Sequence, residues 1–122
     1  MSTVLVIDDS EHVRQYLSDI LSDAGFIVRE AKDGETGLAL FNSSAPDCVL
    51  LDVLMPGIDG FEVLQKIREV AQHLPVLIMT GDDPGWARRT CESYGATGFL
   101  SKSLYADKLV ETIEDVILSS ES

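Results

Sequence analysis

The stretch Cys48-Val49-Leu50-Leu51-Asp52-Val53-Leu54-Met55-Pro56-Gly57-Ile58-Asp59-Gly60 contains an unbroken apolar run that ends on one carboxylate, Asp52. A run rich in Val and Leu and closed by Pro-Gly predicts a strand buried on both faces, typical of the centre of a parallel sheet. Ligands of open α/β sheets bind outside the carboxyl ends of the strands, so Asp52 is a candidate functional residue. An aspartate that only caps the following turn is the alternative.

Four further short runs predict strands on either side of this stretch. They cover residues 3–7, 26–30, 75–79 and 98–101. The run 26–30 ends in charged residues, as edge strands often do. The segments between the strands carry apolar residues at helical spacing. The first helix is predicted to begin at a Ser10 cap and to end at Gly25, and the second to begin at Asp33-Gly34. The third is predicted over Gly60 to Arg68, the fourth from Pro84 to near Tyr94, and the fifth from a Ser103 cap.

Strict alternation of five strands with five helices predicts the α/β class. We expect a single doubly wound five-stranded parallel sheet with helices on both faces and right-handed crossovers. The expected strand order is 2-1-3-4-5, which is the flavodoxin-like order. One domain accounts for residues 1–122, with residues 119–122 as a disordered tail or the start of a linker.

Composition narrows the possible partners. The formal charge of −12 disfavours direct binding to nucleic acid or to an anionic membrane, because such binding needs clustered Lys and Arg. No apolar segment has the length of a membrane span, and no basic region precedes the first predicted strand, so a cytoplasmic location is expected. Cys48 and Cys91 lack metal-binding spacing, which favours reduced structural thiols.

Every predicted strand except the second ends in a group that can do chemistry. These groups are Asp8 and Asp9 after the first strand, Asp52 at the end of the third, Thr80 after the fourth and Lys102 after the fifth. In the order 2-1-3-4-5 the first and third strands are neighbours whose following helices leave toward opposite faces, which opens a crevice between their carboxyl ends. The three aspartates are expected to meet there.

Three carboxylates in one crevice repel one another, and a proton, a nearby cation or a bound metal relieves the repulsion. Hard oxygen ligands favour Mg²⁺ over zinc or copper. Lys102 can neutralise a carboxylate or bind a phosphoryl oxygen, and the Thr80 hydroxyl offers a further donor, although a turn residue without a ligand is the alternative for Thr80. These groups suit phosphoryl transfer onto Asp52.

Four segments resemble the receiver domain of two-component response regulators, and the resemblance covers essentially the whole chain. They are Val6-Ile7-Asp8-Asp9, Leu50-Leu51-Asp52-Val53 with Met55-Pro56-Gly57-Ile58-Asp59-Gly60, Ile78-Met79-Thr80-Gly81, and Gly95-Ala96-Thr97-Gly98-Phe99-Leu100-Ser101-Lys102. The resemblance is specific because the four occur in the family's order, each at the end of a predicted strand.

The resemblance implies that Asp52 accepts a phosphoryl group from the phosphohistidine of a histidine kinase or of a histidine phosphotransfer protein. It also implies a Mg²⁺ site made by Asp9, Asp52 and the main-chain carbonyl of Leu54, with Asp8 reaching the ion through water. The domain then acts in phosphorelay signal transduction rather than as a conventional turnover enzyme.

The resemblance further implies that Thr80 and Lys102 hold phosphoryl oxygens. Phe99 matches the family's aromatic switch, whose ring turns inward when the threonine moves; a plain core aromatic is the alternative. The switched surface would act on an output domain or an effector protein.

Two positions depart from the family pattern. Ser103 replaces the proline that usually follows the lysine, and a trans Lys102-Ser103 bond is expected because a non-proline cis bond costs about 3 kcal/mol. Leu54 is apolar at a position that is often polar in the family. Since its side chain cannot orient an attacking water, slow self-dephosphorylation is expected.

Two other functions compete with a phosphorylated receiver. A Mg²⁺-dependent phosphatase or hydrolase with Asp52 as transient nucleophile would need a cap domain and a substrate pocket, and neither is evident in the sequence. A degenerate receiver that only binds partners is disfavoured because the acidic pair, Asp52, Thr80 and Lys102 are all present.

Overall fold

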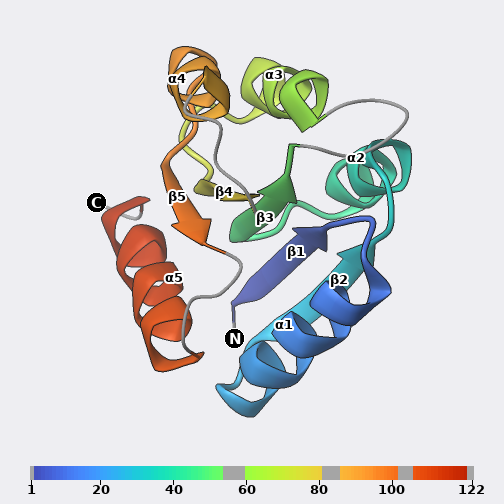
Figure 1. Ribbon diagram of the computed structural model, residues 1–122, viewed down its shortest axis with the longest axis vertical. Helices are drawn as coiled ribbons and strands as arrows, with labels where there is room; N and C mark the ends of the chain where they lie inside the picture. The colour runs from blue at the N-terminus through green and yellow to red at the C-terminus, as the bar shows by residue number, and fades with distance from the viewer. Residues whose placement is uncertain (1, 54–59, 81–85, 102–105, 121–122) are drawn as a thin grey trace.

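The chain is an α/β protein in which a central sheet lies between two layers of helices (Figure 1). The computed structural model describes residues 2–53, 60–80, 86–101 and 106–120. Its strands are β1 (Thr3–Ile7), β2 (Ile27–Ala31), β3 (Cys48–Asp52), β4 (Val76–Thr80) and β5 (Gly98–Ser101). Its helices are α1 (Glu11–Asp23), α2 (Gly34–Ser43), α3 (Gly60–Val70), α4 (Trp86–Ser93) and α5 (Ala106–Ser120).

The sheet confirms the predicted architecture. All strands are parallel, and their order is β2-β1-β3-β4-β5. Every residue of the central strand β3 is buried, as its continuous apolar run predicts. Strand β2 lies at the edge and is shifted by one residue from the predicted 26–30, because Ala31 is still paired with Ile7 of β1.

Two cores form on opposite faces of the sheet, because successive strand residues point to opposite faces. Along β3, Val49 and Leu51 pack on the side of α2, α3 and α4, whereas Cys48 and Leu50 pack on the side of α1 and α5. Burial raises the pKa of the Cys48 thiol to about 12, and both cysteines are free and buried, as predicted for structural thiols.

Local side-chain bonds set the helix starts that the sequence predicted. The Ser10 hydroxyl accepts the N–H of Val13 at 3.3 Å and caps α1. The Asp33 carboxylate caps α2 by accepting the N–H of Thr36 at 2.8 Å, and this bond holds the pKa of Asp33 below its usual value. The predicted Ser103 cap lies outside the described residues.

Helix α5 is longer than the sequence suggested. It runs through Ser120, so Ser119 and Ser120 are helical, whereas the sequence suggested a disordered tail or the start of a linker from residue 119. Ile117 is buried in the last turn, and the Ser120 hydroxyl donates to the Ile117 carbonyl at 2.8 Å, which satisfies one of the carbonyls that a helix end leaves open. Among the described residues, no helix is both long and apolar enough to cross a bilayer.

Candidate functional site

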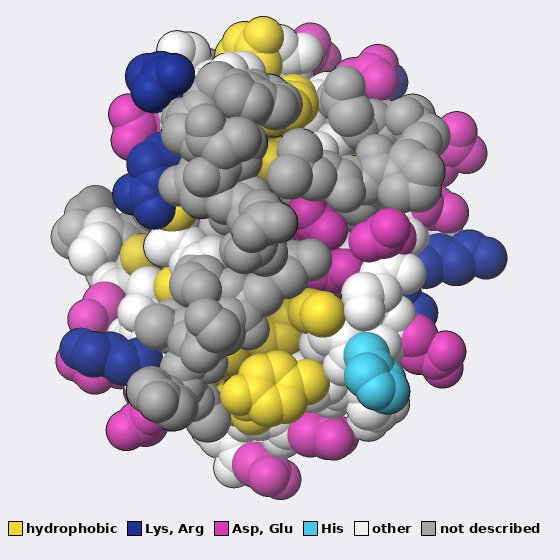
Figure 2. All heavy atoms as spheres, viewed as in Figure 1, with side chains coloured by type: hydrophobic (Ala, Val, Ile, Leu, Met, Phe, Trp, Pro, Cys, Tyr) yellow, Lys and Arg dark blue, Asp and Glu magenta, His cyan; other side chains and the backbone are white. Residues whose placement is uncertain are grey.

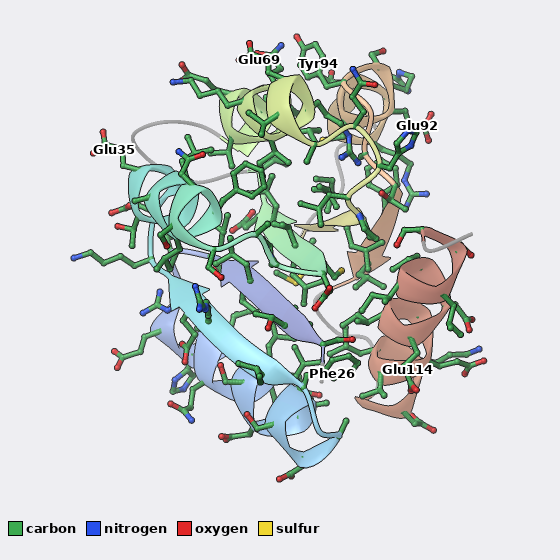
Figure 3. All side chains as sticks on the ribbon, turned by 180° about the vertical axis from the view of Figure 1, so that it is seen from behind. Phe26, Glu35, Glu69, Glu92, Tyr94 and Glu114 are labelled. Carbon is green, nitrogen blue, oxygen red and sulfur yellow. The ribbon has the colours of Figure 1, made fainter. Side chains whose placement is uncertain are left out.

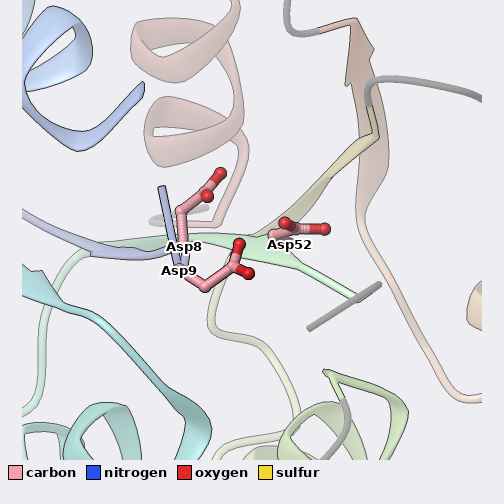
Figure 4. Close-up of side chains that lie close together, drawn as sticks. All are labelled: Asp8, Asp9 and Asp52. Carbon is pink, nitrogen blue, oxygen red and sulfur yellow. The ribbon is translucent and has the colours of Figure 1, made fainter. Parts of the chain in front are cut away.

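Three aspartates meet at the carboxyl ends of β1 and β3, as the strand order predicts (Figure 4). Asp8 and Asp9 follow β1, and Asp52 is the last residue of β3. One carboxylate oxygen from each lies within 4.8 Å of the others. Asp8 and Asp52 are 0% and 3% exposed, while Asp9 faces solvent. The cluster therefore has a buried floor and one open side.

The main chain holds Asp8 firmly in this cluster. Its Oδ1 accepts the N–H of Ser10 at 2.9 Å, and its own N–H donates to the carbonyl of Ala31 at 3.1 Å. The first bond closes the turn between β1 and α1, and the second continues the β1–β2 ladder by one residue. Asp8 is thus positioned by two elements that flank the site.

Arg14 reinforces the same turn, although the sequence did not single it out. Its Nη1 donates to the main-chain carbonyl of Asp8 at 2.7 Å, and its Nε lies 3.5 Å from Oε1 of Glu30 on β2. Both partners come close to Arg14 only once β1, β2 and α1 are assembled. No pattern of spacing in the sequence indicates this role.

The three carboxylates repel one another when they are ionised, and a proton or a cation relieves that repulsion. Two unit charges about 5 Å apart repel by about 3 kcal/mol at an effective dielectric constant near 20. The donor set consists of hard carboxylate oxygens with one open side, which fits Mg²⁺ or Ca²⁺ and not a soft metal. Figure 2 shows a group of acidic side chains gathered where β1 and β3 end.

The other predicted site residues are located only in part. Thr80 ends β4, and the parallel register places it opposite Ser101 at the end of β5. Asp52 pairs with Met79, the residue before Thr80, so the ends of β3, β4 and β5 lie along one edge of the sheet. Leu54 and Lys102 lie outside the described residues.

Phe99 lies at the boundary between core and surface. It is half-buried on β5 opposite Ile78, and its ring packs on the core cluster beneath α3 and α4. The guanidinium carbon of Arg88, on α4, lies 4.7 Å from the centroid of the ring, which is a cation–π contact. The ring is therefore neither a fully enclosed core residue nor an open surface one.

Gly60 brings the start of α3 directly against the end of β3. A Cβ atom at this position would lie 2.2 Å from Cα of Val53 and 2.6 Å from the carbonyl oxygen of Asp52. Backbone atoms cannot move aside as a flexible side chain can. The close approach requires glycine and couples α3 to the strand that carries Asp52.

A doubly wound sheet of this order with acidic residues at the ends of β1 and β3 defines a receiver module. The family model of the response regulator receiver domain matches residues 4–114, and the chain belongs to this family. It is a receiver domain of the kind found in two-component signalling systems.

Individual relatives agree with this assignment. The chain is 38% identical over 107 residues to the response regulator MprA of Mycolicibacterium vanbaalenii, a match that covers 88% of this chain and 46% of that protein. It spans about half the length of the curated relatives it matches.

Solved structures show the same fold. The chemotaxis protein CheY4 of Vibrio cholerae superposes with a TM-score of 0.89 at 34% identity, over 95% of this chain and 98% of that one. NtrX of Brucella abortus superposes with a TM-score of 0.92 at 32% identity, over 98% of this chain and 27% of that one.

Proposed function

We propose that the whole chain is one receiver domain that is phosphorylated on Asp52 in a Mg²⁺-dependent reaction and then acts on a partner through a changed surface. The observation that carries the proposal is the cluster of Asp8, Asp9 and Asp52, whose carboxylate oxygens lie within 4.8 Å of one another. A buried acid at a strand end beside two further acids is a costly arrangement unless a cation and a reaction use it.

The phosphodonor is the phosphohistidine of a histidine kinase or of a histidine phosphotransfer protein. A carboxylate oxygen of Asp52 attacks the phosphorus atom, and an O–P bond forms as the N–P bond to the imidazole breaks. The electron pair of that bond stays on the imidazole nitrogen, which takes a proton and leaves a neutral histidine. The product on this chain is an acyl phosphate.

The residues around Asp52 would bind the metal ion and hold the acidic turn in position. Asp9, Asp52 and the Leu54 carbonyl would hold Mg²⁺, with Asp8 oriented toward it through water. The ion, when bound, supplies positive charge to the oxygens of the transferring group. The hydrogen bonds from Ser10 to Asp8 and from Arg14 to the Asp8 carbonyl keep the acidic turn in place.

Thr80 and Lys102 would hold the phosphoryl oxygens, and Phe99 would report their movement to the surface near α4. The Arg88 guanidinium lies over the Phe99 ring. A rotation of the ring would therefore either break this cation–π contact or move the Arg88 side chain with it. The partner that reads the change is an output domain or an effector protein. A phosphoryl group adds about −1.5 to −2 charge, enough to reorganise a threonine and a lysine.

Intact mass spectrometry after incubation with Mg²⁺ and acetyl phosphate tests the proposal. A gain of one phosphoryl group that accumulates on the protein is the expected result. Release of phosphate with no accumulated adduct would instead favour a hydrolase with Asp52 as transient nucleophile. No reaction with acetyl phosphate, and none with phosphoramidate as second donor, would favour a module that only binds partners.

Mg²⁺ is expected to raise the melting temperature, because it binds the folded cluster and relieves repulsion among the carboxylates. At ten times its dissociation constant the ion adds about 1.4 kcal/mol, or about 5 °C for a chain of this size. Differential scanning fluorimetry against NaCl of equal ionic strength measures the shift. Asp9→Asn should reduce it, whereas Asp19→Asn on the exposed face of α1 should leave it intact; equal shifts in both variants would rule out the cluster as the metal site.

A further inference from the structure

A groove lies between α1 and α5, away from the acidic cluster. It has a volume of about 660 Å³. Its apolar residues are Ile20 and Ala24 at the end of α1, and Val110 and Leu118 on α5. Leu118 is 65% exposed, although it lies beside the buried Ile117. An exposed leucine in a concave apolar strip gains contacts when a partner covers it.

A second hollow extends the groove past the end of α1. It has a volume of about 330 Å³ and shares Ala24, Glu114 and Leu118 with the first. Phe26, just before β2, also lines it, and Figure 3 shows Phe26 and Glu114 projecting from neighbouring parts of the molecule. The two hollows thus form one elongated surface, which we call the α1–α5 groove.

The rim of the α1–α5 groove is acidic. Five carboxylates line it, namely Asp23, Asp107, Glu111, Glu114 and Asp115. No Lys or Arg among the described residues lines either hollow. The nearest lysine along α5, Lys108, lies 3.9 Å from Glu111 and is itself exposed, so screening by water leaves most of the rim charge in place.

The groove is separate from the candidate phosphorylation site. The aspartate cluster lies after β1 and at the end of β3, whereas the groove is made by the last turn of α1, the outer face of α5 and Phe26. Neither set contains a residue of the other. A ligand of the groove therefore does not need the phosphorylation chemistry in order to bind.

We propose that the α1–α5 groove binds a cationic amphipathic helix of a partner protein. An elongated apolar floor between two helices accepts the apolar face of a third helix, which is a common mode of peptide recognition. Five carboxylates on the rim match Lys or Arg on the flanks of such a helix and raise the rate of encounter. The complementarity between the acidic rim and a basic helix favours this partner over the alternatives.

The same charges argue against two other occupants. A second copy of the chain would bring its own acidic rim against this one, and like charges that face each other across an interface destabilise it. The overall charge of −12 adds to that repulsion. Nucleic acid and anionic lipid surfaces are repelled for the same reason.

A fluorescein-labelled peptide of about 18 residues, with Leu at helical positions i, i+3, i+4 and i+7 and Lys elsewhere, is the probe. Fluorescence anisotropy at physiological salt should show saturable one-to-one binding. A peptide of the same composition with scrambled order, which lacks the apolar face, should bind about tenfold more weakly or worse. Equal binding of the two peptides would overturn the proposal, because it would indicate general attraction to an acidic protein.

Matched variants locate the site. The double variant Glu114→Lys, Asp115→Lys should weaken binding about tenfold, and Leu118→Ala should weaken it about fivefold. The control double variant Glu35→Lys, Glu69→Lys changes the net charge equally but lies on α2 and α3, away from Glu114 in Figure 3, and should weaken binding by less than about twofold. Equal losses in the two double variants would overturn the proposal.

Amide chemical shifts give an independent readout. Titration of the isotope-labelled protein with the peptide should move resonances of residues 20–26 and 107–118 and leave those of α2 and α3 unchanged. Shifts confined to α4 and β5 would place the peptide on another face and overturn the proposal. Concentration-dependent sedimentation of the protein alone, with loss of self-association in Leu118→Ala, would assign the groove to a second copy and overturn it as well.

Discussion

Asp52→Asn is expected to abolish the gain of a phosphoryl group and to raise the melting temperature of the protein in the absence of divalent cations. The first effect follows because an amide oxygen is a poor nucleophile and does not form a stable phosphoryl adduct. The second follows because Asp52 is 3% exposed and its carboxylate lies beside those of Asp8 and Asp9. Removing one of three clustered negative charges leaves one repulsive pair where there were three.

The size of the stabilisation can be bounded. Each ionised pair costs about 3 kcal/mol at an effective dielectric constant near 20, and solvent at the exposed Asp9 screens part of this. A net gain of about 1–2 kcal/mol corresponds to a rise of about 4–8 °C for a chain of this length. The shift produced by Mg²⁺ should shrink at the same time, because the variant has lost a ligand and the metal has less repulsion to relieve.

Thermal melts with and without Mg²⁺, together with intact mass after acetyl phosphate treatment, measure all three effects on one preparation. Asp19→Asn, an exposed isosteric change on α1, is the matched control and should alter none of them. A variant at position 52 that still gains a phosphoryl group would place the acceptor elsewhere. A fall in melting temperature would mean that attractive contacts of Asp52 outweigh the repulsion.

The sequence was informative about this site because the site depends on topology. Apolar runs predicted β1 and β5 with the observed limits and β3 as a strand buried on both faces. Once the order of the sheet follows from the alternation of elements, the meeting of Asp8, Asp9 and Asp52 follows from which strands are neighbours.

Contacts between elements could not be predicted in the same way. Arg14 bonds to the carbonyl of Asp8 and pairs with Glu30, and the Arg88 guanidinium covers the Phe99 ring. Each contact joins side chains whose approach depends on helix rotation and rotamer, which hydrophobic periodicity does not specify. For Phe99 the sequence left a choice between a switch residue and a plain core aromatic. Its ring is half-buried, so its burial alone does not decide between the two roles.

The ends of the helices could be predicted from the sequence only in part. Ser10 and Asp33 were predictable caps, because a cap is a bond between residues three apart in the chain. The end of α5 was not, since the serines that suggest a tail are held by the buried Ile117 and by the bond from Ser120 to its carbonyl.

Gly60→Ala is expected to be among the most destabilising single methyl additions in the described chain. The new Cβ would lie 2.2 Å from Cα of Val53 and 2.6 Å from the carbonyl oxygen of Asp52, distances that non-bonded atoms do not tolerate. The start of α3 or the end of β3 must move, and both pack into the core through Val63, Leu64 and Val53. A cost of about 3 kcal/mol or more, or about 12 °C in melting temperature, is expected.

Gly25→Ala separates this steric cost from the intrinsic cost of replacing glycine. Gly25 has a φ of +95°, and a Cβ there would meet no atom within 4 Å, so only backbone strain of about 1–2 kcal/mol opposes the change. Because one displaced atom at Gly60 is the carbonyl oxygen of Asp52 and the other belongs to the next residue, Val53, Gly60→Ala should also slow phosphorylation by acetyl phosphate, whereas Gly25→Ala should not. Melting temperatures and rates of mass gain are measured for both variants. A smaller destabilisation by Gly60→Ala than by Gly25→Ala would show that α3 can shift away from β3. The inferred tight coupling of α3 to the strand that carries Asp52 would then be wrong.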